Sequence, residues 1–437
     1  MVDDALLADL VDWLRIPSVS TGGGDPADLE RAAQWVVDRV RAAGGTGALV
    51  PTPGFPLAVG ELGADAGPGA PTVLVYGHYD VQGPGDPGAW TSPPFAPEVR
   101  DGRLYARGAS DDKGNFLPLL HAACELKREG ALPVHVRVLV EGEEEMGSTH
   151  VGDWVRADER GADVAIVFDS GMVDERTAAV TVGLRGLCQC HLEVEVGRRD
   201  LHSGMYGGSV LNALHVVHGL LAEVVPGPDG RLREELRAGI EPLGQAERAS
   251  LSALPDAAAE LAAVGGRPVH PGAAAEHWER NGADASLDVN ALHGGEPRTV
   301  VPARASATFT MRLAPGQDPE AMREVLEGLL RGALPAGADL TTRWDTGAPA
   351  LFPPAEPAIA LAGEAIERAT GLPCAFVRSG GSIPVVAELG RRMPVVVGGF
   401  GLPEDDIHAP DESFRLESLR LGHLAARELL TTLARLG

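Results

Sequence analysis

Basic residues are scarce in this chain of 437 residues. Its 37 lysine and arginine residues stand against 62 aspartate and glutamate residues, so the formal net charge is 37 − 62 = −25. A nucleic-acid partner requires clusters of basic side chains that neutralise phosphates, and an anionic membrane surface attracts basic segments for the same reason. We therefore expect neither nucleic acid nor a membrane among the partners of this protein.

Cysteine is also scarce, with four residues in the whole chain. They are Cys124, Cys188, Cys190 and Cys374. Four irregularly spaced cysteines do not make a disulfide framework or a paired zinc-binding motif. Because Cys188 and Cys190 alternate with polar neighbours, we expect them to lie as small apolar side chains on one face of a strand.

Long apolar runs are missing as well. The sequence has no stretch of ~18 uninterrupted apolar residues, which predicts no transmembrane helix. The first ten residues are acidic and lack the basic and apolar regions of a secretion signal. Together with the low cysteine content, these features predict a cytoplasmic protein.

The remaining pattern is that of a layered α/β protein with an insertion. Short apolar segments alternate with helical ones near both ends of the chain, whereas the middle contains strictly alternating segments typical of a sheet with one solvated face. Expected strands cover 72–76, 134–140, 163–168, 394–397, 187–196 and 301–313, and expected helices 26–43, 209–223, 317–332 and 416–433. We therefore predict an α/β domain formed by 1–185 and 381–437, and an inserted α+β domain at 186–380.

Acidic and imidazole side chains recur where the expected strands end, which is where open α/β sheets place their sites. They are His78 and Asp80, Asp111 and Asp112, Glu143 to Glu145, Asp169, and His408. Each segment alone has an ordinary explanation, such as a helix N-cap at Asp111 or a solvated face at Glu143 to Glu145. Their joint placement indicates one nitrogen and oxygen donor set, suited to zinc or manganese.

These motifs, in this order, resemble the aminoacylase, carboxypeptidase G and carnosine-dipeptidase family of di-zinc metallopeptidases. The resemblance runs along nearly the whole chain and is closest to the carnosine-dipeptidase branch. The resemblance rests on these motifs and residues: His78-x-Asp80, Asp111-Asp112-Lys-Gly114, Glu144-Glu145-x-Gly147-Ser148, Asp169, His408, Gly183-Leu-Arg-Gly186, Asp200-Leu-His202-Ser-Gly204, Thr299-Val-x-Pro302 and Gly380-Gly-Ser-Ile-Pro384. It implies a three-layer catalytic domain with a central, mostly parallel sheet. It also implies that the inserted domain is a ferredoxin-like lid that mediates dimerisation.

The resemblance implies a role for each matching residue. His78 and Asp169 would bind one divalent ion, Glu145 and His408 a second, and Asp111 would bridge both. Asp80 would orient the ring of His78. Two such ions, zinc or else manganese or cobalt, would share and activate a water, and Glu144 would be the general base that takes its proton. A cis peptide bond between Asp111 and Asp112 is also implied.

The inserted domain would complete the site. By the same resemblance, His202 would reach the active site of the neighbouring subunit in a homodimer and stabilise the oxyanion, whereas Arg312, Gly381 and Ser382 would bind the substrate carboxylate. The expected reaction is therefore hydrolysis of the amide bond of a dipeptide. Without the resemblance, His202 is an exposed histidine in a turn and Arg312 a strand-end arginine.

One position departs from the dipeptidase pattern. Ser379 stands where dipeptidase relatives usually have a glutamate that helps to bind the free amino end of the substrate. This leaves room for an N-acyl-amino-acid deacylase or a pathway-specific amidohydrolase. A third alternative, an inactive relative that serves as a binding or scaffold protein, is disfavoured because Glu144 and the ligand set are intact.

Overall fold

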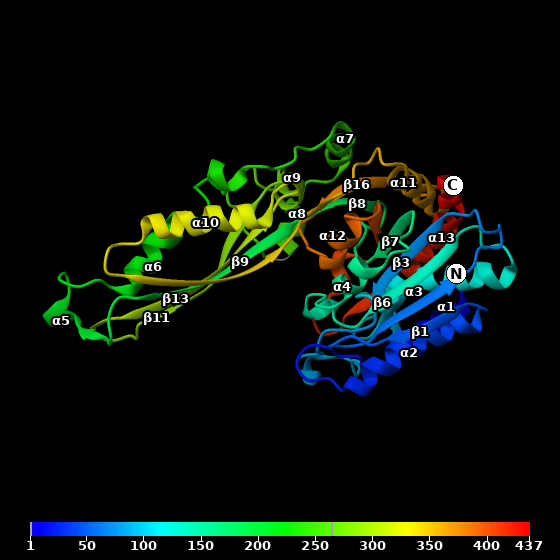
Figure 1. The fold of residues 1–437 in the computed structure, drawn as a ribbon, viewed down its shortest axis with the longest axis horizontal. Coiled ribbons are helices and arrows are strands. Elements are labelled where there is room, and N and C mark those ends of the chain that lie inside the picture. The colour runs from blue at the N-terminus through cyan, green and yellow to red at the C-terminus, as the bar shows by residue number, and fades with distance from the viewer. Residues whose placement is uncertain (1, 264) are drawn as a thin grey trace. The chain divides into compact units, whose positions relative to one another are not determined.

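The structure, a computed structural model, describes residues 2–263 and 265–437, which fold into two units (Figure 1). The first unit comprises the chain up to Val182 together with Phe352–Val377 and Pro384–Gly437, and the second comprises Gly183–Leu351 and Arg378–Ile383. The segment Phe352–Val377, which the sequence analysis assigned to the inserted domain, belongs to the first unit. The reason is that its helix α11 (Pro357–Thr370) packs against α13 (Leu416–Leu433) and β17 (Val395–Gly398).

A twisted sheet forms the centre of the first unit. Its strands follow the order β1-β2-β6-β3-β7-β17-β8, and β16 also pairs with β8. Their bounds are β1 Thr46–Val50, β2 Leu57–Leu62, β3 Thr72–His78, β6 His135–Glu141, β7 Val164–Phe168, β8 Ala178–Leu184 and β16 Cys374–Ser379. The four strands β6, β3, β7 and β17 run parallel, and the outer strands are antiparallel. The expected mostly parallel sheet is thus confirmed.

Helices cover both faces of this sheet, because every residue of β7 and all but the first of β3 are buried. Helix α3 (Lys113–Glu129) packs against β3, β7, α1 (Asp4–Leu14) and α13, and α2 (Pro26–Ala42) packs against β1 and β2. Helix α12 (Pro384–Gly390) packs against α4 (Val151–Ala157) and β17. A small sheet, β4 Glu98–Arg100, β5 Arg103–Tyr105 and β18 Ser413–Arg415, completes the unit.

The second unit is built on a four-stranded antiparallel sheet in the order β11-β13-β9-β14. The strands are β9 Gly186–Glu195, β11 Ser286–Gly294, β13 Arg304–Leu313 and β14 Asp339–Gly347, and the helices α6 Ala213–Ala222 and α10 Pro319–Ala333 connect them. The chain order β9-α6-β11-β13-α10-β14, with β9 and β13 in the middle of the sheet, is the ferredoxin-like arrangement that was predicted. Smaller elements are β10 Leu201–His202, α5 Ser203–Tyr206, α7 Gln245–Ala253, α8 Ala258–Ala263, α9 His277–Gly282, β12 Val300–Val301 and β15 Ala350–Leu351.

One face of this second sheet carries the core of the unit. Residues of β9 and β13 alternate between buried and less buried positions, as strands with one covered face do. Cys188, Cys190, Phe309 and Met311 lie on the covered face with apolar residues of α6 and α10. All four cysteines are free thiols.

No helix within the described ranges combines the length and the apolar character needed to cross a bilayer.

Candidate active site

The polar residues singled out in the sequence meet at one edge of the sheet of the first unit. His78 is the last residue of β3, Glu144 and Glu145 lie in a 3-10 turn after β6, and Asp169 directly follows β7. Asp111 lies just before α3, and its peptide bond to Asp112 is cis, as expected. These parallel strands end side by side, which brings His78 and Asp169, 91 positions apart, into one cluster.

Asp111 is the centre of this cluster. Its Oδ1 lies 3.0 Å from Nε2 of His78, and its Oδ2 lies 3.0 Å from Nε2 of His408. His408 Nε2 also lies 3.1 Å from Oε2 of Glu145, and His78 Nε2 lies 4.0 Å from Oδ1 of Asp169. The two oxygens of one carboxylate therefore face two different imidazoles.

Asp80 holds the neighbouring elements in register. Its side chain is fully buried and accepts hydrogen bonds from the hydroxyl of Ser20 at 2.7 Å and from the backbone N–H groups of Glu144 and Glu145 at 3.3 and 3.2 Å. Its Oδ1 also lies 3.4 Å from Nδ1 of His78. Asp80 thus ties the turn with both glutamates to the strand end that carries His78.

The carboxylates of this cluster crowd one another in a buried place. Burial, followed by the nearby Asp111 and Glu145 charges, raises the pKa of Glu144 to about 7 even though His78 opposes the shift. Burial and the adjacent Asp112 charge likewise raise the pKa of Asp169 well above its ordinary value. The hydrogen bonds to Asp111 and Glu145 raise the pKa of His408 to about 10. A site with this surplus of negative charge favours cations.

The donor set fits two divalent ions. His78, Asp111 and Asp169 offer ligand atoms within 4.8 Å of one another, and so do Asp111, Glu145 and His408. The two groups share Asp111, which is the arrangement that a bridging carboxylate requires. A cavity of about 340 Å³ opens beside them and is lined by Asp111, Asp169, Met172 and Ile407 among others. It leaves space for a small ligand next to the cluster.

Two supporting residues were missed at the sequence level. Glu412 is fully buried, pairs with Arg107 at 2.6 Å and accepts the N–H groups of Gly108, Ser110 and Asp111 at 2.9 to 3.1 Å. Gln82 donates its backbone N–H and its side-chain amide to the carboxylate of Glu145 at 3.2 and 3.0 Å. Glu412 lies four residues after His408, and this closeness is the single sequence signal that could have indicated it.

The three expected substrate-binding residues, Arg312, Gly381 and Ser382, gather in the second unit. A guanidinium nitrogen of Arg312 donates to the hydroxyl of Ser382 at 3.2 Å, and the N–H of Gly381 donates to the hydroxyl of Ser379 at 3.2 Å. Arg185, from the Gly183-Leu-Arg-Gly186 motif, donates to the carbonyl of Gly380. Burial and the neighbouring Arg312 charge lower the pKa of Arg185 to about 10. Two guanidinium groups therefore lie close together, which favours an anionic ligand.

His202 lies at the other end of the same unit. It pairs with Val300, and the adjacent Asp200 accepts the N–H of Ala303, next to the start of β13. Arg312 is the ninth residue of β13, so at 3.2–3.4 Å per residue about 26 Å of strand separates it from Arg304. The structure therefore does not bring His202 together with Arg312 within this unit.

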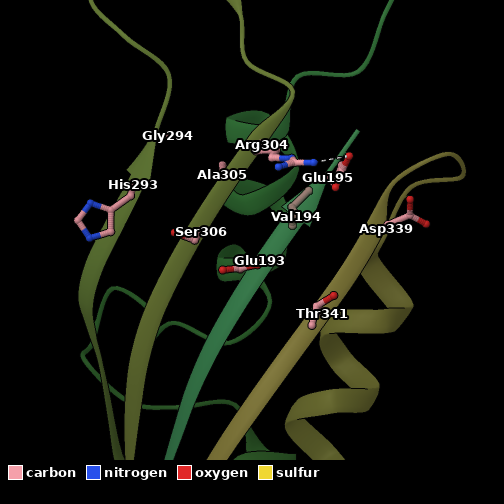
Figure 2. A pocket seen from close by; sticks show the side chains of 10 residues that line it. All are labelled: Glu193, Val194, Glu195, His293, Gly294, Arg304, Ala305, Ser306, Asp339 and Thr341. Carbon is pink, nitrogen blue, oxygen red and sulfur yellow. Dashed lines mark hydrogen bonds and ion pairs between the residues drawn. The ribbon is translucent and has the colours of Figure 1, made fainter. Parts of the chain in front are cut away.

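A further hollow of about 460 Å³ lies across β9, β11, β13 and β14 (Figure 2). Its lining includes Glu193, Glu195, Asp339, His293 and Arg304, and Arg304 pairs with Glu195 at 3.0 Å. Three carboxylates around one paired arginine do not form a metal cluster or a catalytic constellation. The cavity beside Asp111 is therefore the better candidate site.

An α/β unit that carries a histidine and carboxylate set at its strand ends has the construction of a metal-dependent hydrolase. The family model of Peptidase family M20/M25/M40 matches residues 74–432, so the chain belongs to this peptidase family. The resemblance that the sequence motifs indicated is thereby confirmed.

Individual relatives agree with this family assignment. The chain is 29% identical over 405 residues to the Cys-Gly metallodipeptidase of Schizosaccharomyces pombe, which covers 85% of this chain and 81% of that protein. Among solved structures it is similar to an M20 family metallo-carboxypeptidase from Sulfolobus solfataricus, with a TM-score of 0.87, 26% identity and coverage of 99% and 100% of the two chains. It is also similar to human carnosine dipeptidase 1, with a TM-score of 0.80, 25% identity and coverage of 99% and 96%. These relatives support a hydrolase of small peptides.

Proposed function

We propose that this protein is a dinuclear-metal dipeptidase that hydrolyses the amide bond of a dipeptide with a free carboxylate. The observation that carries the proposal is the position of Asp111, whose two oxygens each lie 3.0 Å from a different histidine. In this assignment His78 and Asp169 hold one ion, Glu145 and His408 hold the other, and Asp111 bridges them. The bound ions, zinc by preference and manganese or cobalt otherwise, would supply activation of a water and polarisation of the amide carbonyl.

The proton is moved by Glu144. Its backbone is anchored to Asp80, and its carboxyl has a pKa of about 7, raised by burial and by the Asp111 and Glu145 charges. A base with a pKa near the working pH both accepts a proton from water and returns it to the departing amine. Bound cations would lower this pKa, so Glu144 would be ionised at neutral pH when substrate arrives.

The second unit would orient the substrate and form the dimer. Arg312 and the loop with Gly381 and Ser382 would bind the terminal carboxylate, supported by the guanidinium of Arg185. His202 would donate to the developing oxyanion of a neighbouring copy. The separation of His202 from Arg312 along β13 supports this assignment, because one copy does not hold both at one place in its second unit. The working form would thus be a homodimer. We propose that it acts in the cytoplasm, as the sequence predicts.

A second candidate, an N-acyl-amino-acid deacylase, is favoured by one observation. The hydroxyl of Ser379 accepts the N–H of Gly381, so this position holds the loop and offers no carboxylate to a free amino group. The neighbouring Arg378 is buried in an ion pair with Glu247 at 2.6 Å, so it does not supply a group that binds a free amino end either.

One experiment separates these possibilities. The protein loaded with zinc or manganese is assayed on Cys-Gly and β-Ala-His, on their N-acetylated forms and on their C-terminal amides, with metal content measured on the same samples. A dipeptidase should cleave the free dipeptides and show no activity on their C-terminal amides, whereas a deacylase should prefer the N-acetylated forms. Two bound ions without hydrolysis of any of these compounds would contradict both proposals.

A further inference from the structure

A second histidine and carboxylate cluster lies in the first unit, apart from the candidate active site. His121 and Glu125 belong to α3 and His423 belongs to α13. These three residues offer ligand atoms that all lie within 4.8 Å of one another. The cluster lies where these two packed helices face each other, and no residue of the Asp111 cluster takes part in it.

Helix geometry explains why these side chains converge. His121 and Glu125 are four residues apart, so they lie one turn apart on the same face of α3. Helix α13 packs against α3 and brings His423 over that face. The rings of His121 and His423 meet edge to face, with centroids 5.3 Å apart and planes at 86°. Both imidazoles therefore approach Glu125 from different helices.

The ring of His121 is the feature that an ordinary ion-pair network leaves unexplained. It is 7% exposed, and its Nε2 and Nδ1 each lie 3.7 Å from a carboxylate oxygen, of Asp3 and Asp9 respectively. These separations exceed hydrogen-bond length, and the ring makes no hydrogen bond within the part of the chain that the structure describes. Two ligands at about 2.1 Å from one zinc ion in tetrahedral geometry lie about 3.4 Å apart. The 3.7 Å separation of Nε2 of His121 from Asp3 is close to that of two ligands that share an ion.

Glu125 already carries a competing cation. Its Oε2 lies 2.9 Å from Nε2 of His423 and 2.5 Å from a guanidinium nitrogen of Arg427. A carboxylate has about four lone-pair sites, so Glu125 can contact Arg427 and a metal ion together. Arg427 also pairs with Glu129 at 2.9 Å, which gives it a second partner if an ion displaces it.

We propose that His121, Glu125 and His423 form a further metal site, for a divalent transition ion such as zinc, that joins α3 to α13. Two imidazoles and one carboxylate are a usual protein ligand set for zinc. Asp3, the N-cap of α1, would supply a fourth oxygen and tie the start of the chain to the same ion. An ion held there would bridge α3 and α13, so its role would be structural. The proposal does not depend on the proposed function.

The test counts zinc ions in the full-length, metal-loaded protein. Wild type, His423→Gln and the exposed-surface control His218→Gln are loaded with zinc, dialysed against a weak chelator and measured by mass spectrometry. We expect His423→Gln to hold one ion fewer per chain than wild type and His218→Gln, whatever number binds at the Asp111 cluster. We also expect the zinc-dependent rise in melting temperature to shrink in His423→Gln. Equal zinc content in all three proteins would overturn the proposal.

A gain-of-affinity variant keeps the test decisive if His423→Gln is poorly folded. Arg427→Gln removes the competing guanidinium and leaves the three ligands in place. We expect this variant to bind zinc at this site about tenfold more tightly than wild type in competition with a chromophoric chelator, because one opposing charge is gone. The matched control Arg420→Gln, on the same helix, should bind as wild type does. An unchanged affinity in Arg427→Gln would contradict the proposal.

Discussion

The two places that would handle a substrate carry opposite charge. The Asp111 cluster of the first unit gathers carboxylates, and burial together with their mutual repulsion raises the pKa of Glu144 and of Asp169. The cluster around Arg312 in the second unit gathers guanidinium groups, and burial together with the neighbouring Arg312 charge lowers the pKa of Arg185. Like charges kept together at low solvent exposure indicate that each place is built for an oppositely charged ligand. The first favours cations and the second favours anions, which in the proposed function would be the substrate carboxylate.

The largest effect is expected in the first unit. Glu144→Ala should lower kcat about 10³-fold, because it removes the group that moves the proton. It should leave metal content unchanged, since the five ligands remain. Steady-state kinetics and metal analysis on the same preparation test both statements, with the exposed Glu159→Ala as control. Lost metal with retained turnover would show that Glu144 is a ligand.

The next effect tests whether a single copy completes its own site. His202→Ala should lower kcat about 10²-fold through loss of an oxyanion donor, whereas the exposed His293→Ala of the same unit should not. Mixing His202→Ala with Glu144→Ala gives heterodimers in which one of the two sites has both residues. If sites are shared, activity should return to about a quarter of the wild-type value in a 1:1 mixture. No recovery in verified heterodimers would place His202 and Glu144 in the same copy.

A smaller effect is expected at the cationic place. Arg312→Lys keeps the charge but loses the planar fork that binds a carboxylate through two hydrogen bonds. KM for a dipeptide should rise about tenfold with little change in kcat, and the activity on the C-terminal amide should hardly change. Arg304→Lys, at the opposite end of β13, is the matched control. If Arg312→Lys affected the hydrolysis of the dipeptide and of its C-terminal amide equally, Arg312 would not be the residue that binds the substrate carboxylate.

The first unit shows how far the sequence predicts the fold and the candidate site. The parallel strands are readable because a strand covered on both faces is continuously apolar, as at Val73 to Tyr76. The metal-ligand candidates are readable because each stands in a short motif after a strand or at the start of a helix. Glu412 is not readable in this way, since its contacts with Gly108 and Asp111 span about 300 residues and its neighbours suggest a solvated acidic pair.

The same limit explains the domain boundary and the second cluster. The segment Phe352–Val377 follows the alternating strands of the inserted region in sequence, but α11 packs on α13 at the far end of the chain. His121 and His423 each look like single histidines on amphipathic helices. Their meeting depends on the packing of α3 against α13, which no local pattern encodes.

The smallest expected effect is on the pH dependence of stability, and it tests whether the surplus of carboxylates in the first unit extends behind the Asp111 cluster to Glu141. Glu141 is the last residue of β6 and comes just before the turn with Glu144. Burial, reinforced by the Asp80 and Glu144 charges, raises the pKa of Glu141 to about 8. A 2.6 Å hydrogen bond from the hydroxyl of Tyr76 opposes this shift. An acid whose pKa is higher in the folded than in the unfolded state keeps its proton longer when folded. The free energy of unfolding should therefore fall as pH rises from about 4.5 to about 8, by at most about 1.4 kcal/mol per pH unit from this group.

Glu141→Gln isolates that contribution. The amide oxygen can still accept from Tyr76, and the side chain no longer titrates. Urea unfolding at several pH values should show equal stability of variant and wild type near pH 5 and a growing advantage of the variant toward pH 8. Glu129→Gln, an exposed carboxylate at the end of α3, should follow the wild-type curve. Parallel curves for Glu141→Gln and wild type would mean that the pKa of Glu141 is the same in the folded and the unfolded protein. The surplus negative charge would then be confined to the residues around Asp111. The contrast in charge with the arginine cluster would hold for the two ligand sites and not for the interior behind them.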